Sequence, residues 1–492
     1  MKIIKYLNFK QIIFSILCAS LLSVFSLPKI DAGPVSSDDY QYWYIATHLS
    51  KTGDYGFTNP SLNDESDYAN PLNNSGIRRG ESLYPFIVST LINLTTTERE
   101  LSSINSDCIY GINDGLCPVL GGTSVLVNLL FTSFKFLLIF FTTYIFYNKL
   151  SKRSHLFVSL LLCATFPYTN KDLITYALLL FYLISYFDFF TEKTKNIFRY
   201  GSLSLLPLTN PIFFYFLFIN FLISILLMVK SKEINKKTIF LLLICMIPSV
   251  VWSSRNAIQT GEFTITSRGS ETVGIRAEFL SIDYQDIPAG IVYYTPSNRI
   301  TNIFTGYLWN KVGSSNNWQE LFDRSNENSI LRLGHQKRGY VYERMKQNLN
   351  LKNLLYADVV NLYGYNFATN EYRKASFNLI FDNKVKYLST SSMFLYRGLF
   401  PEFNQLKENV KDNLFGSFLN EILLFLRFFP IIYSFLYLIL NFKKSIYEIE
   451  NYIFLYIFFS YGMLTHFIPR YSTLLIPFTI YLYLQRVSLK NV

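Results

Sequence analysis

The chain has few charged residues for its length. Asp, Glu, Lys and Arg make up 16% of its 492 residues, whereas soluble globular proteins carry about 25%. Half of the residues are apolar and 18% are aromatic. The apolar residues gather into blocks of roughly 15 to 25, the length that a helix needs to cross a bilayer. The composition therefore predicts a polytopic membrane protein rather than a soluble fold.

The chain also lacks the short motifs of several functional classes. It has no Cys/His spacing typical of zinc sites, no P-loop, no G-x-S-x-G and no dinucleotide-binding glycine pattern. It has no internal repeat and no long low-complexity tract. The sequence therefore does not predict a zinc protein, a P-loop enzyme, an α/β-hydrolase or a dinucleotide-dependent oxidoreductase.

Cysteine is scarce, with five residues in the chain. Cys18, Cys163 and Cys245 lie inside apolar blocks and are most simply core residues. Cys108 and Cys117 enclose the stretch CIYGINDGLC, and an oxidising outer compartment would let them form a small-loop disulfide. The sequence leaves open whether these two cysteines pair, and the bond would have a structural role only.

The excess of basic residues points to membrane topology. The chain has 45 Lys and Arg against 34 Asp and Glu, a net charge of +11. Nothing in it resembles a nucleic-acid-binding module, and the positive charge falls in short loops between apolar blocks. Such loops set the orientation of membrane spans. We therefore predict membrane lipids, and no nucleic acid, among the partners.

The apolar blocks predict about ten membrane spans. The first, about residues 11–28, follows Lys2, Lys5 and Lys10 and has no small-x-small cleavage site after it. We therefore predict a retained anchor with its N-terminus in the cytoplasm rather than a cleaved signal peptide. Arg427 is the main charge that falls within a span. The other spans are predicted at about 120–147, 154–169, 172–190, 197–209, 211–229, 238–253, 416–440, 450–466 and 471–486.

When the predicted spans alternate in direction across the membrane from a cytoplasmic N-terminus, every predicted inside loop is basic, as the positive-inside rule requires. The short outside turns have only Lys171 and Arg470 as basic residues. The inside loops contain Lys149, Lys152, Arg153, Lys193, Lys195, Arg199, Lys230, Lys232, Lys236, Lys237, Lys443, Lys444, Arg486 and Lys490. Both ends of the chain are thus predicted to be cytoplasmic, in a multi-pass protein of the cytoplasmic (inner) membrane.

This threading divides the chain into three parts. Residues 1–255 form an N-terminal membrane region whose long first outer loop, 29–119, carries two adjacent acids. Residues 256–415 form an extracytoplasmic domain of α/β or mixed structure, and residues 416–492 form the C-terminal spans. The predicted fold class is mainly α, a polytopic membrane helix bundle with an outer-face domain.

The unusual polar residues beside the predicted spans gather on the outer side. Simple helix caps would be scattered over both sides, so this clustering suggests one site at the membrane surface. Acids among bases at that depth suit a ligand that carries a phosphate and lies partly in the bilayer. The residues are Asp38 and Asp39, Arg78 and Arg79, Lys171 and Asp172, Asn210, Arg255 and Asn256, and His466 and Arg470.

Each of these residues also has a purely structural interpretation. Ser36 and the two acids after it make a good helix start, with a Ser cap and negative charge in the first turn. Lys171 and Asp172 suit a surface turn with its own ion pair. Arg255 and Arg470 suit arginines that anchor a span by reaching the headgroups.

In their order along the chain, these fragments resemble the polytopic GT-C glycosyltransferases that use polyprenyl-phosphate sugars. The branch is that of the protein O-mannosyltransferases and aminoarabinose transferases, a glycosyltransferase family 39-like group. There an acid after the first span is followed by Tyr, Ala and a Gly turn, as in Asp38, Tyr42, Ala46 and Gly53. Further matches are Arg78-Arg79-Gly-Glu-Ser-Leu-Tyr84-Pro85, Asp172, Trp252-Ser-Ser-Arg255-Asn256 with Gly261 and Phe263, and Pro469-Arg470-Tyr471 with Pro477.

The resemblance covers the membrane region and hardly touches residues 256–415. The loop before Tyr84 has Gly-Glu-Ser where the family has prolines, and the second acid is Asp39 where the mannosyltransferases commonly have Glu. These departures leave the acceptor and the role of Arg79 open.

The candidate residues fit the transfer of a sugar from a lipid phosphate. The acceptor hydroxyl must lose a proton as it attacks the anomeric carbon, and one carboxylate can act as general base. Asp38 is the first candidate and Asp39 the second, with Asp172 as a supporting acid. Arginine suits the leaving phosphate because its planar fork meets phosphate oxygens bidentately. The residues predicted to hold the donor are Arg79, Lys171, Arg255, Arg470, Tyr42, Asn256 and Tyr84.

The predicted activity is an inverting hexosyl- or pentosyltransfer from a polyprenyl-phosphate sugar to a lipid, glycan or protein, facing the periplasm or cell exterior. The resemblance implies that a divalent cation is optional, and the sequence has no convincing metal site. One alternative is a lipid-linked polysaccharide polymerase or ligase, which needs arginines in outer loops but no acid in the first one. The other is a transporter or flippase, which places polar groups at mid-membrane in interrupted spans.

Overall fold

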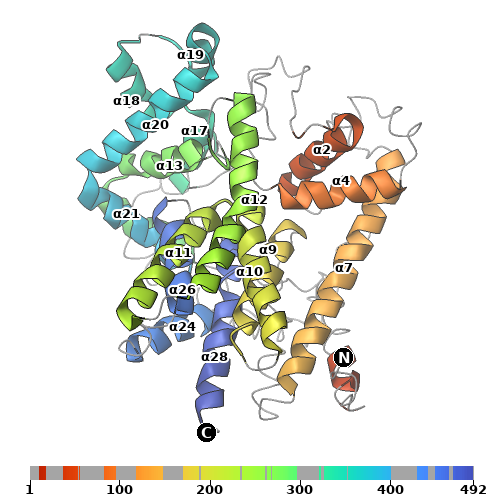
Figure 1. Cartoon of the computed structure of the whole chain (residues 1–492). Coiled ribbons are helices and arrows are strands. Elements are labelled where there is room, and N and C mark those ends of the chain that lie inside the picture. Colours follow the sequence, from red (N-terminus) through yellow and green to blue (C-terminus); the bar gives the residue numbers. More distant parts are fainter. Residues whose placement is uncertain are drawn as a thin grey trace, which may run out of the picture.

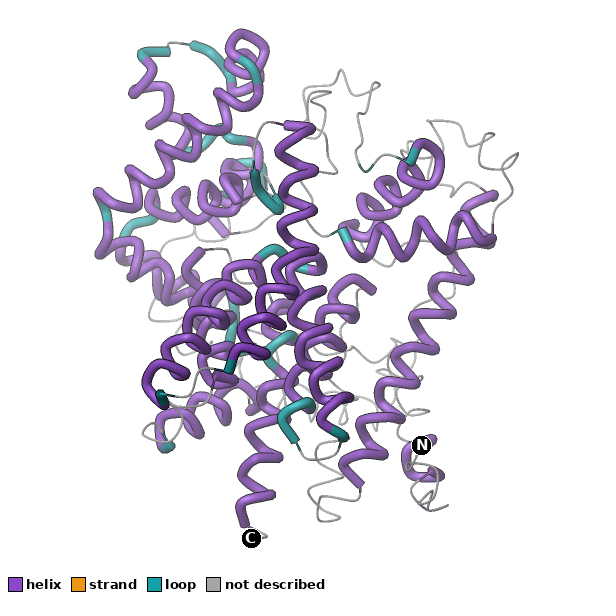
Figure 2. The backbone as a smooth tube through the Cα atoms, viewed as in Figure 1, coloured by secondary structure: helices purple, strands orange, loops and turns teal. Residues whose placement is uncertain are grey.

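The computed structural model describes most of the chain. The described residues are 10, 12–17, 37–53, 55, 82–95, 118–147, 170–187, 190–232, 235–260, 263–266, 269–295, 321–322, 326–351, 353–400, 429–441, 449–464 and 469–490. Within these ranges the chain forms helices joined by loops and no strand (Figure 2). The mainly α fold class is therefore confirmed in its coarse form, as a helical bundle.

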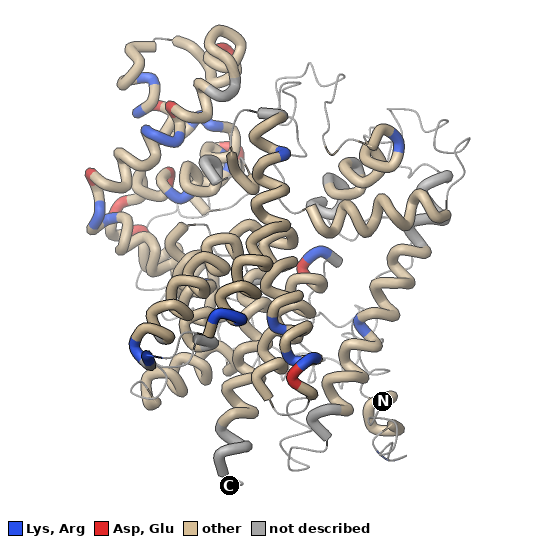
Figure 3. The backbone as a smooth tube through the Cα atoms, in the orientation of Figure 1, with Lys and Arg blue, Asp and Glu red and all other residues tan. Residues whose placement is uncertain are grey.

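The bundle is built from the apolar segments of both ends of the chain. Its helices lie side by side, and α28 ends at the lower edge of the molecule (Figure 1). Most charged residues lie at helix ends or in the helices between α13 and α21, whereas the middle stretches of the bundle helices are mostly uncharged (Figure 3). The bundle helices are α7 (Pro118–Tyr147), α9 (Asn170–Ile184), α10 (Glu192–Thr209), α11 (Ile212–Ser231), α12 (Lys236–Thr260), α24 (Phe429–Leu440), α26 (Ile449–Leu464), α27 (Pro469–Thr473) and α28 (Ile476–Lys490).

Within the described ranges, three helical segments are long and apolar enough to cross a membrane. They are Leu126–Tyr144 in α7, Ile212–Lys230 in α11 and Lys236–Ile258 in α12. Large apolar side chains on them are exposed, such as Leu226 and Phe240, as lipid-facing residues would be. The helices Leu83–Thr95, Phe429–Leu440 and Asn451–Leu464 are apolar but shorter. The count of about ten spans stays a prediction, since the spans at 154–169 and most of 11–28 lie outside the described residues.

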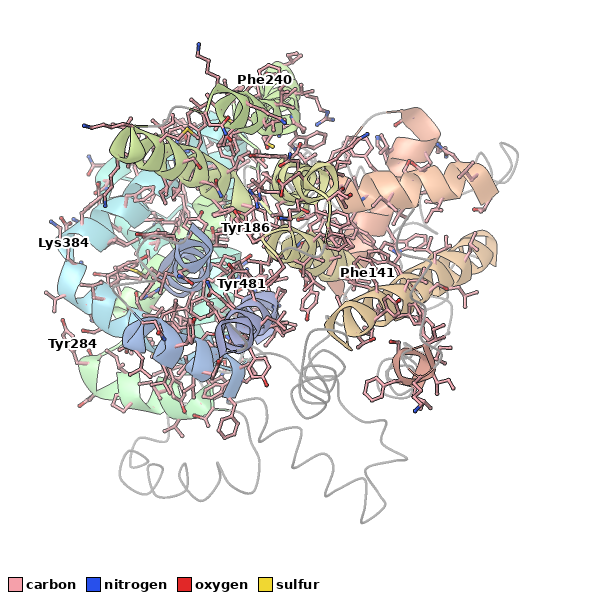
Figure 4. The ribbon with its side chains drawn as sticks, turned by 60° about the horizontal axis from the view of Figure 1, so that its bottom comes forward. Phe141, Tyr186, Phe240, Tyr284, Lys384 and Tyr481 are labelled. Atoms are coloured by element: carbon pink, nitrogen blue, oxygen red, sulfur yellow. The ribbon has the colours of Figure 1, made fainter. Side chains whose placement is uncertain are left out.

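Polar side chains inside the bundle are joined to one another between helices. The Arg199 guanidinium of α10 lies 4.0 Å from the ring centroid of Tyr186, whose hydroxyl is 2.7 Å from the Tyr182 hydroxyl. The Asn220 side-chain amide of α11 donates to the same Tyr182 oxygen at 3.0 Å. Tyr186 also meets the ring of Tyr481 on α28 at 6.4 Å, where the labelled side chains lie close together (Figure 4). These contacts supply partners that lipid cannot.

Two helices of the first predicted outer loop lie across the upper end of α7 (Figure 1). They are α2 (Ser37–Thr52) and α4 (Leu83–Thr95), which pack against each other. The hydroxyls of Ser50 and Ser89 are 2.9 Å apart at this contact, and Ser50 also donates to the Ser89 carbonyl at 3.1 Å. Because Tyr42, Ile45 and Ala46 are almost fully buried, α2 is held by its apolar face.

The described part of residues 256–415 is helical, so the α/β form expected for this domain is not found there. Short apolar repeats of helical spacing, such as Val341, Tyr342 and Met345, are buried together, and left-handed residues such as Asn350 end the helices. The elements are α13 (Gly269–Glu278), η2 (Phe279–Ser281), η3 (Tyr284–Asp286), α14 (Ile287–Tyr293), α17 (Ile330–Gln336), α18 (Tyr340–Leu349), α19 (Tyr356–Tyr363), α20 (Tyr365–Asp382) and α21 (Lys384–Arg397).

This helical domain shares its core with the bundle. Phe279, Met393 and Phe394 belong to the main hydrophobic core, whereas a second, smaller core lies between α18, α19 and α20. Helix α21 packs closely on α26, because a Cβ at Gly462 would lie 2.3 Å from Leu395 Cδ2. The helical domain and the bundle therefore share one hydrophobic core, although charged residues are more frequent in the domain than in the middle of the bundle helices.

A fully buried arginine joins α13 to α21. Arg276 donates through Nη2 to the Tyr387 carbonyl at 3.0 Å and to the hydroxyls of Thr390 at 3.0 Å and Ser391 at 2.6 Å. Its guanidinium carbon lies 4.6 Å and 4.8 Å from the ring centroids of Tyr387 and Phe394. Burial lowers the pKa of Arg276 to about 10, so the group is still charged at neutral pH and holds the two helices together.

Glu278 closes α13 and satisfies the first backbone amides of α18. Its carboxylate accepts from the N–H groups of Tyr340 and Val341 and from the Tyr372 hydroxyl at 3.3 Å, so two otherwise unpaired amides are satisfied. A Cβ at Gly339 would lie 2.3 Å from Glu278 Oε2, which leaves this position to glycine. Burial raises the pKa of Glu278 to about 7 despite these hydrogen bonds.

The raised pKa of Glu278 predicts a particular dependence of stability on pH. Between pH 4.5, the ordinary pKa, and about 7 the folded protein binds more protons than the unfolded chain. Stability attributable to this group therefore falls as pH rises through that window and is constant above it. Glu278→Gln keeps an acceptor oxygen without the charge. We expect the melting temperature of this variant to lack that fall, when measured from about pH 5 to about pH 8.

A matched control is an acid of α18, the helix whose first amides Glu278 satisfies. Glu343 of α18 is an exposed residue paired with Lys346 at 2.6 Å, so Glu343→Gln is expected to leave the pH dependence of melting as in the parent chain. If Glu278→Gln and the parent lose stability in parallel over the window, the buried carboxyl does not titrate there and the assignment is wrong.

Candidate functional site

Lys171 and Asp172 lie at the start of α9 and are buried, with 5% and 2% of their surfaces exposed. Two opposite charges taken out of water are stable only with close polar or charged partners. An acid in the first turn also interacts favourably with the positive end of the helix dipole. The interpretation of this pair as a solvent-exposed surface turn is therefore wrong, because the residues lie inside the molecule.

Tyr42 of α2 lies against Lys171. The Lys171 ammonium is 5.2 Å from the centroid of the Tyr42 ring, within the range of a cation–π interaction. The Tyr84 ring of α4 meets Tyr42 edge-on at 5.9 Å and Phe131 of α7 at 5.6 Å. Three predicted donor-site residues, Tyr42, Tyr84 and Lys171, are thus brought together from segments far apart in the sequence.

A residue of the C-terminal helices also lies near Lys171 and Asp172. Tyr461 of α26 is fully buried and lies within electrostatic range of Lys171 and Asp172. Its ring stacks on Tyr471 at 4.4 Å and 15°, and its hydroxyl accepts from the Asn210 amide at 2.6 Å. Tyr471 directly follows Arg470 on α27. Tyr471 is thus linked through Tyr461 to the surroundings of Lys171 and Asp172, and the clustering of all the candidates in one site stays a prediction.

Arg255 and Asn256 hold the upper part of α12. Arg255 donates to the Tyr55 carbonyl and, at 3.1 Å, to Asn256 Oδ1, and its guanidinium carbon lies 4.9 Å from the Trp252 ring centroid. The Asn256 amide donates to the carbonyls of Thr264 at 2.8 Å and Ile265 at 3.2 Å. The fully buried Asn256 thus fastens the chain after α12, and its contact with substrate stays a prediction.

The remaining predicted site residues lie wholly or partly outside the described part of the chain. Asp38 and Asp39 fall in the first turn of α2, one turn before Tyr42, and Arg470 falls in α27. The side chains of these three residues are not among those described, and neither is any part of Arg79. Their roles stay predictions.

Sequence reasoning missed two buried residues. Lys135 is 5% exposed inside the candidate span Leu126–Tyr144, and an ionisable residue within a span is a functional candidate by default. A lysine in the apolar run LLFTSFKFLLIFF was a visible signal, whereas Arg427, the mid-span charge that was noted, lies outside the described residues. Tyr461 carried no such signal, because nothing distinguishes it from the many other aromatic residues of its span.

The site offers cations, an acid and aromatic rings at one end of the bundle. Among the residues whose side chains are described, no group of three or more His, Cys, Asp or Glu could hold a metal ion. The prediction that a divalent cation is optional stays untested, since Asp38 and Asp39 are not part of that search. Chemically, the Lys171 ammonium at the N-terminal end of α9 suits an anion, and a phosphate is such a ligand.

No protein-family model matches the chain, and no match is found among curated proteins or solved structures.

Proposed function

We propose that this chain is a membrane glycosyltransferase that moves a sugar from a polyprenyl-phosphate donor to an acceptor at the outer side of the cytoplasmic membrane. The observation that carries the proposal is the buried pair of Lys171 and Asp172 against Tyr42, a residue of α2, whose first turn contains Asp38. The pair lies where the bundle meets the helices of the first loop, so a lipid-linked donor could keep its tail in the bilayer. The ordered fragments that resemble GT-C glycosyltransferases support the same activity.

The proposed reaction is a single displacement at the anomeric carbon. The acceptor oxygen forms the new bond as the bond from the anomeric carbon to the phosphate oxygen breaks, which inverts the centre. Asp38, or Asp39 beside it, takes the proton of the acceptor hydroxyl. The electron pair of the broken bond leaves with the polyprenyl phosphate, whose charge is stabilised by Lys171, Arg470 and Arg79.

The decisive experiment uses the full chain in lipid nanodiscs with labelled polyprenyl-phosphate sugars and candidate lipid, glycan and protein acceptors. We expect transfer of label, and we expect Lys171→Met to lower it, because a neutral side chain of similar length cannot stabilise the leaving phosphate. Tyr215→Phe is a suitable control, since Tyr215 of α11 is 65% exposed among the apolar residues of a candidate span. Absence of transfer from every donor would overturn the proposal.

One observation favours a second candidate function, a transporter or flippase of lipid-linked substrates. Lys135 is buried near the middle of a candidate span, and charges at that depth commonly mark substrate or ion pathways. Following a labelled lipid-linked sugar in vesicles distinguishes the two functions. A flippase moves the labelled lipid between leaflets without breaking the bond between sugar and phosphate. If Lys135→Met abolished such movement and no transfer were seen, this second function would replace the first.

A further inference from the structure

A stripe of exposed apolar side chains runs across the corner between α20 and α21. Phe377, Phe381, Val385 and Leu388 are 42%, 63%, 71% and 57% exposed. Phe377 and Phe381 are four residues apart on α20, and Val385 and Leu388 are three apart on α21, so each pair shares a helix face. The rings of Phe377 and Phe381 stack at 6.4 Å. We call these four residues the α20–α21 stripe. Contiguous apolar surface of this kind usually marks a site of contact with a protein or a membrane.

Lysine and tyrosine accompany the stripe. The Lys384 ammonium is 6.0 Å from the Phe381 ring centroid, and the Lys386 ammonium is 5.8 Å from the ring centroid of the half-exposed Tyr284. Lys384 and Tyr284 lie along the same edge of the molecule (Figure 4). Aromatic residues with long basic side chains are typical of the boundary between hydrocarbon and headgroups, where lysine reaches water from an apolar setting.

Helix α21 lies across one end of α26. The Tyr387 hydroxyl donates to the Met463 carbonyl, and Leu395 packs against Gly462. Tyr387 and Leu395 are about 12 Å apart along α21, yet both contact the last turn of α26, so the two helices cross rather than run in parallel. Helix α26 is apolar but shorter than the candidate spans. Because the sequence predicts a span at 450–466, a helix laid across its end would lie along the membrane surface.

The stripe continues the apolar surface of the bundle. Leu464, the last residue of α26, is 50% exposed beside the Tyr387 contact. The α20–α21 corner lies beside the bundle at a height between the two ends of α12, whereas α19 lies beyond the upper end of α12 (Figure 1). Because α12 contains the candidate span Lys236–Ile258, the corner is placed at the level of a bilayer surrounding that helix.

We propose that the α20–α21 stripe is embedded in the interfacial layer of the bilayer that the bundle crosses, with phospholipid as its partner. The apolar residues contact the upper acyl chains, and Lys384 and Lys386 reach the headgroups. Asp382, which follows Phe381 in the sequence, is paired with Arg344 at 3.3 Å. Its negative charge is therefore compensated and would not repel anionic headgroups. The inference rests on membrane crossing and is independent of the proposed sugar transfer.

Photocrosslinking of the full chain in phospholipid nanodiscs tests this inference. A benzophenone amino acid is placed at Phe381, and lipid adducts are quantified by mass spectrometry after illumination. The matched position is Tyr363 on α19, which is 52% exposed but away from the level of the span. Leu226, 66% exposed in the α11 candidate span, reports contact with lipid directly. We expect lipid adducts at Leu226 and Phe381, and several-fold fewer at Tyr363.

The outcomes separate the possible errors. Equal yields of lipid adduct at Phe381 and Tyr363, or protein adducts at Phe381 in place of lipid, would overturn the proposal, the latter in favour of a second protein chain on the stripe. Lipid adducts missing from Leu226 as well would contradict membrane crossing by α11 itself, which is a different failure. If the probe at Phe381 prevents folding, Leu388 on α21 takes its place with the same expectations.

Discussion

Asp38→Asn is expected to lower sugar transfer by about 10²–10⁴-fold, the usual contribution of a general base. The asparagine keeps the size and the helix-start position of the residue at the beginning of α2 but cannot accept the acceptor's proton. Residues four apart on a helix share a face, so Asp38 belongs to the face of Tyr42, whose ring lies against Lys171. The measurement is the rate of label transfer from a polyprenyl-phosphate sugar, with expression and insertion unchanged.

The neighbouring acid serves as the matched comparison. Asp39→Asn makes the same chemical change one residue further along α2, so it has a similar effect on the helix start but projects from a different side. A large loss with Asp38→Asn and a small one with Asp39→Asn identifies Asp38 as the base, and the reverse result identifies Asp39. Full activity in both variants would contradict the assignment of a base to this helix.

The contacts around Lys171 show what the sequence could and could not predict. Apolar blocks and loop charges predicted helices and placed Tyr42, Tyr84 and Lys171 at the same end of the bundle, and the structure brings these residues together. The burial of Lys171 was not predicted, because sequence position next to a span does not say which neighbours cover it. That information lies in the pairing of α2 and α4 with α9, which is a tertiary property.

The helical domain illustrates a second limit. Its helices are short, such as the seven residues of α17 and the eight of α19, so the helical period barely repeats before a turn interrupts it. Caps such as Asp358, which accepts from the Leu355 amide at 2.7 Å, define these helices more than periodicity does. Asn256 illustrates a related limit: a side-chain amide that binds backbone carbonyls looks the same in sequence as one that binds a substrate.

Gly274→Val is expected to destabilise the helical domain by about 3 kcal/mol, at the upper end of the usual range for overpacking a core. A Cβ at Gly274 would lie 2.2 Å from Cε1 of Tyr372 and 3.0 Å from its Cζ. The Tyr372 ring cannot simply turn away, because the residue is 1% exposed and its hydroxyl donates to the buried Glu278 at 3.3 Å. Thermal melting in detergent, followed by loss of helicity, measures the effect.

Gly201 provides the control because it is also a helical glycine but has open space around it. It lies in α10, where no atom is found within 4 Å of an added Cβ, and valine has a slightly better helix propensity than glycine. Gly201→Val should therefore melt close to the parent chain. Equal melting of the two variants would mean that Tyr372 can move at little cost. A displaced Tyr372 hydroxyl would no longer donate to Glu278, the α13 carboxylate that accepts from the first amides of α18. Gly274→Val therefore tests the contact between α13 and α20 together with this cap of α18.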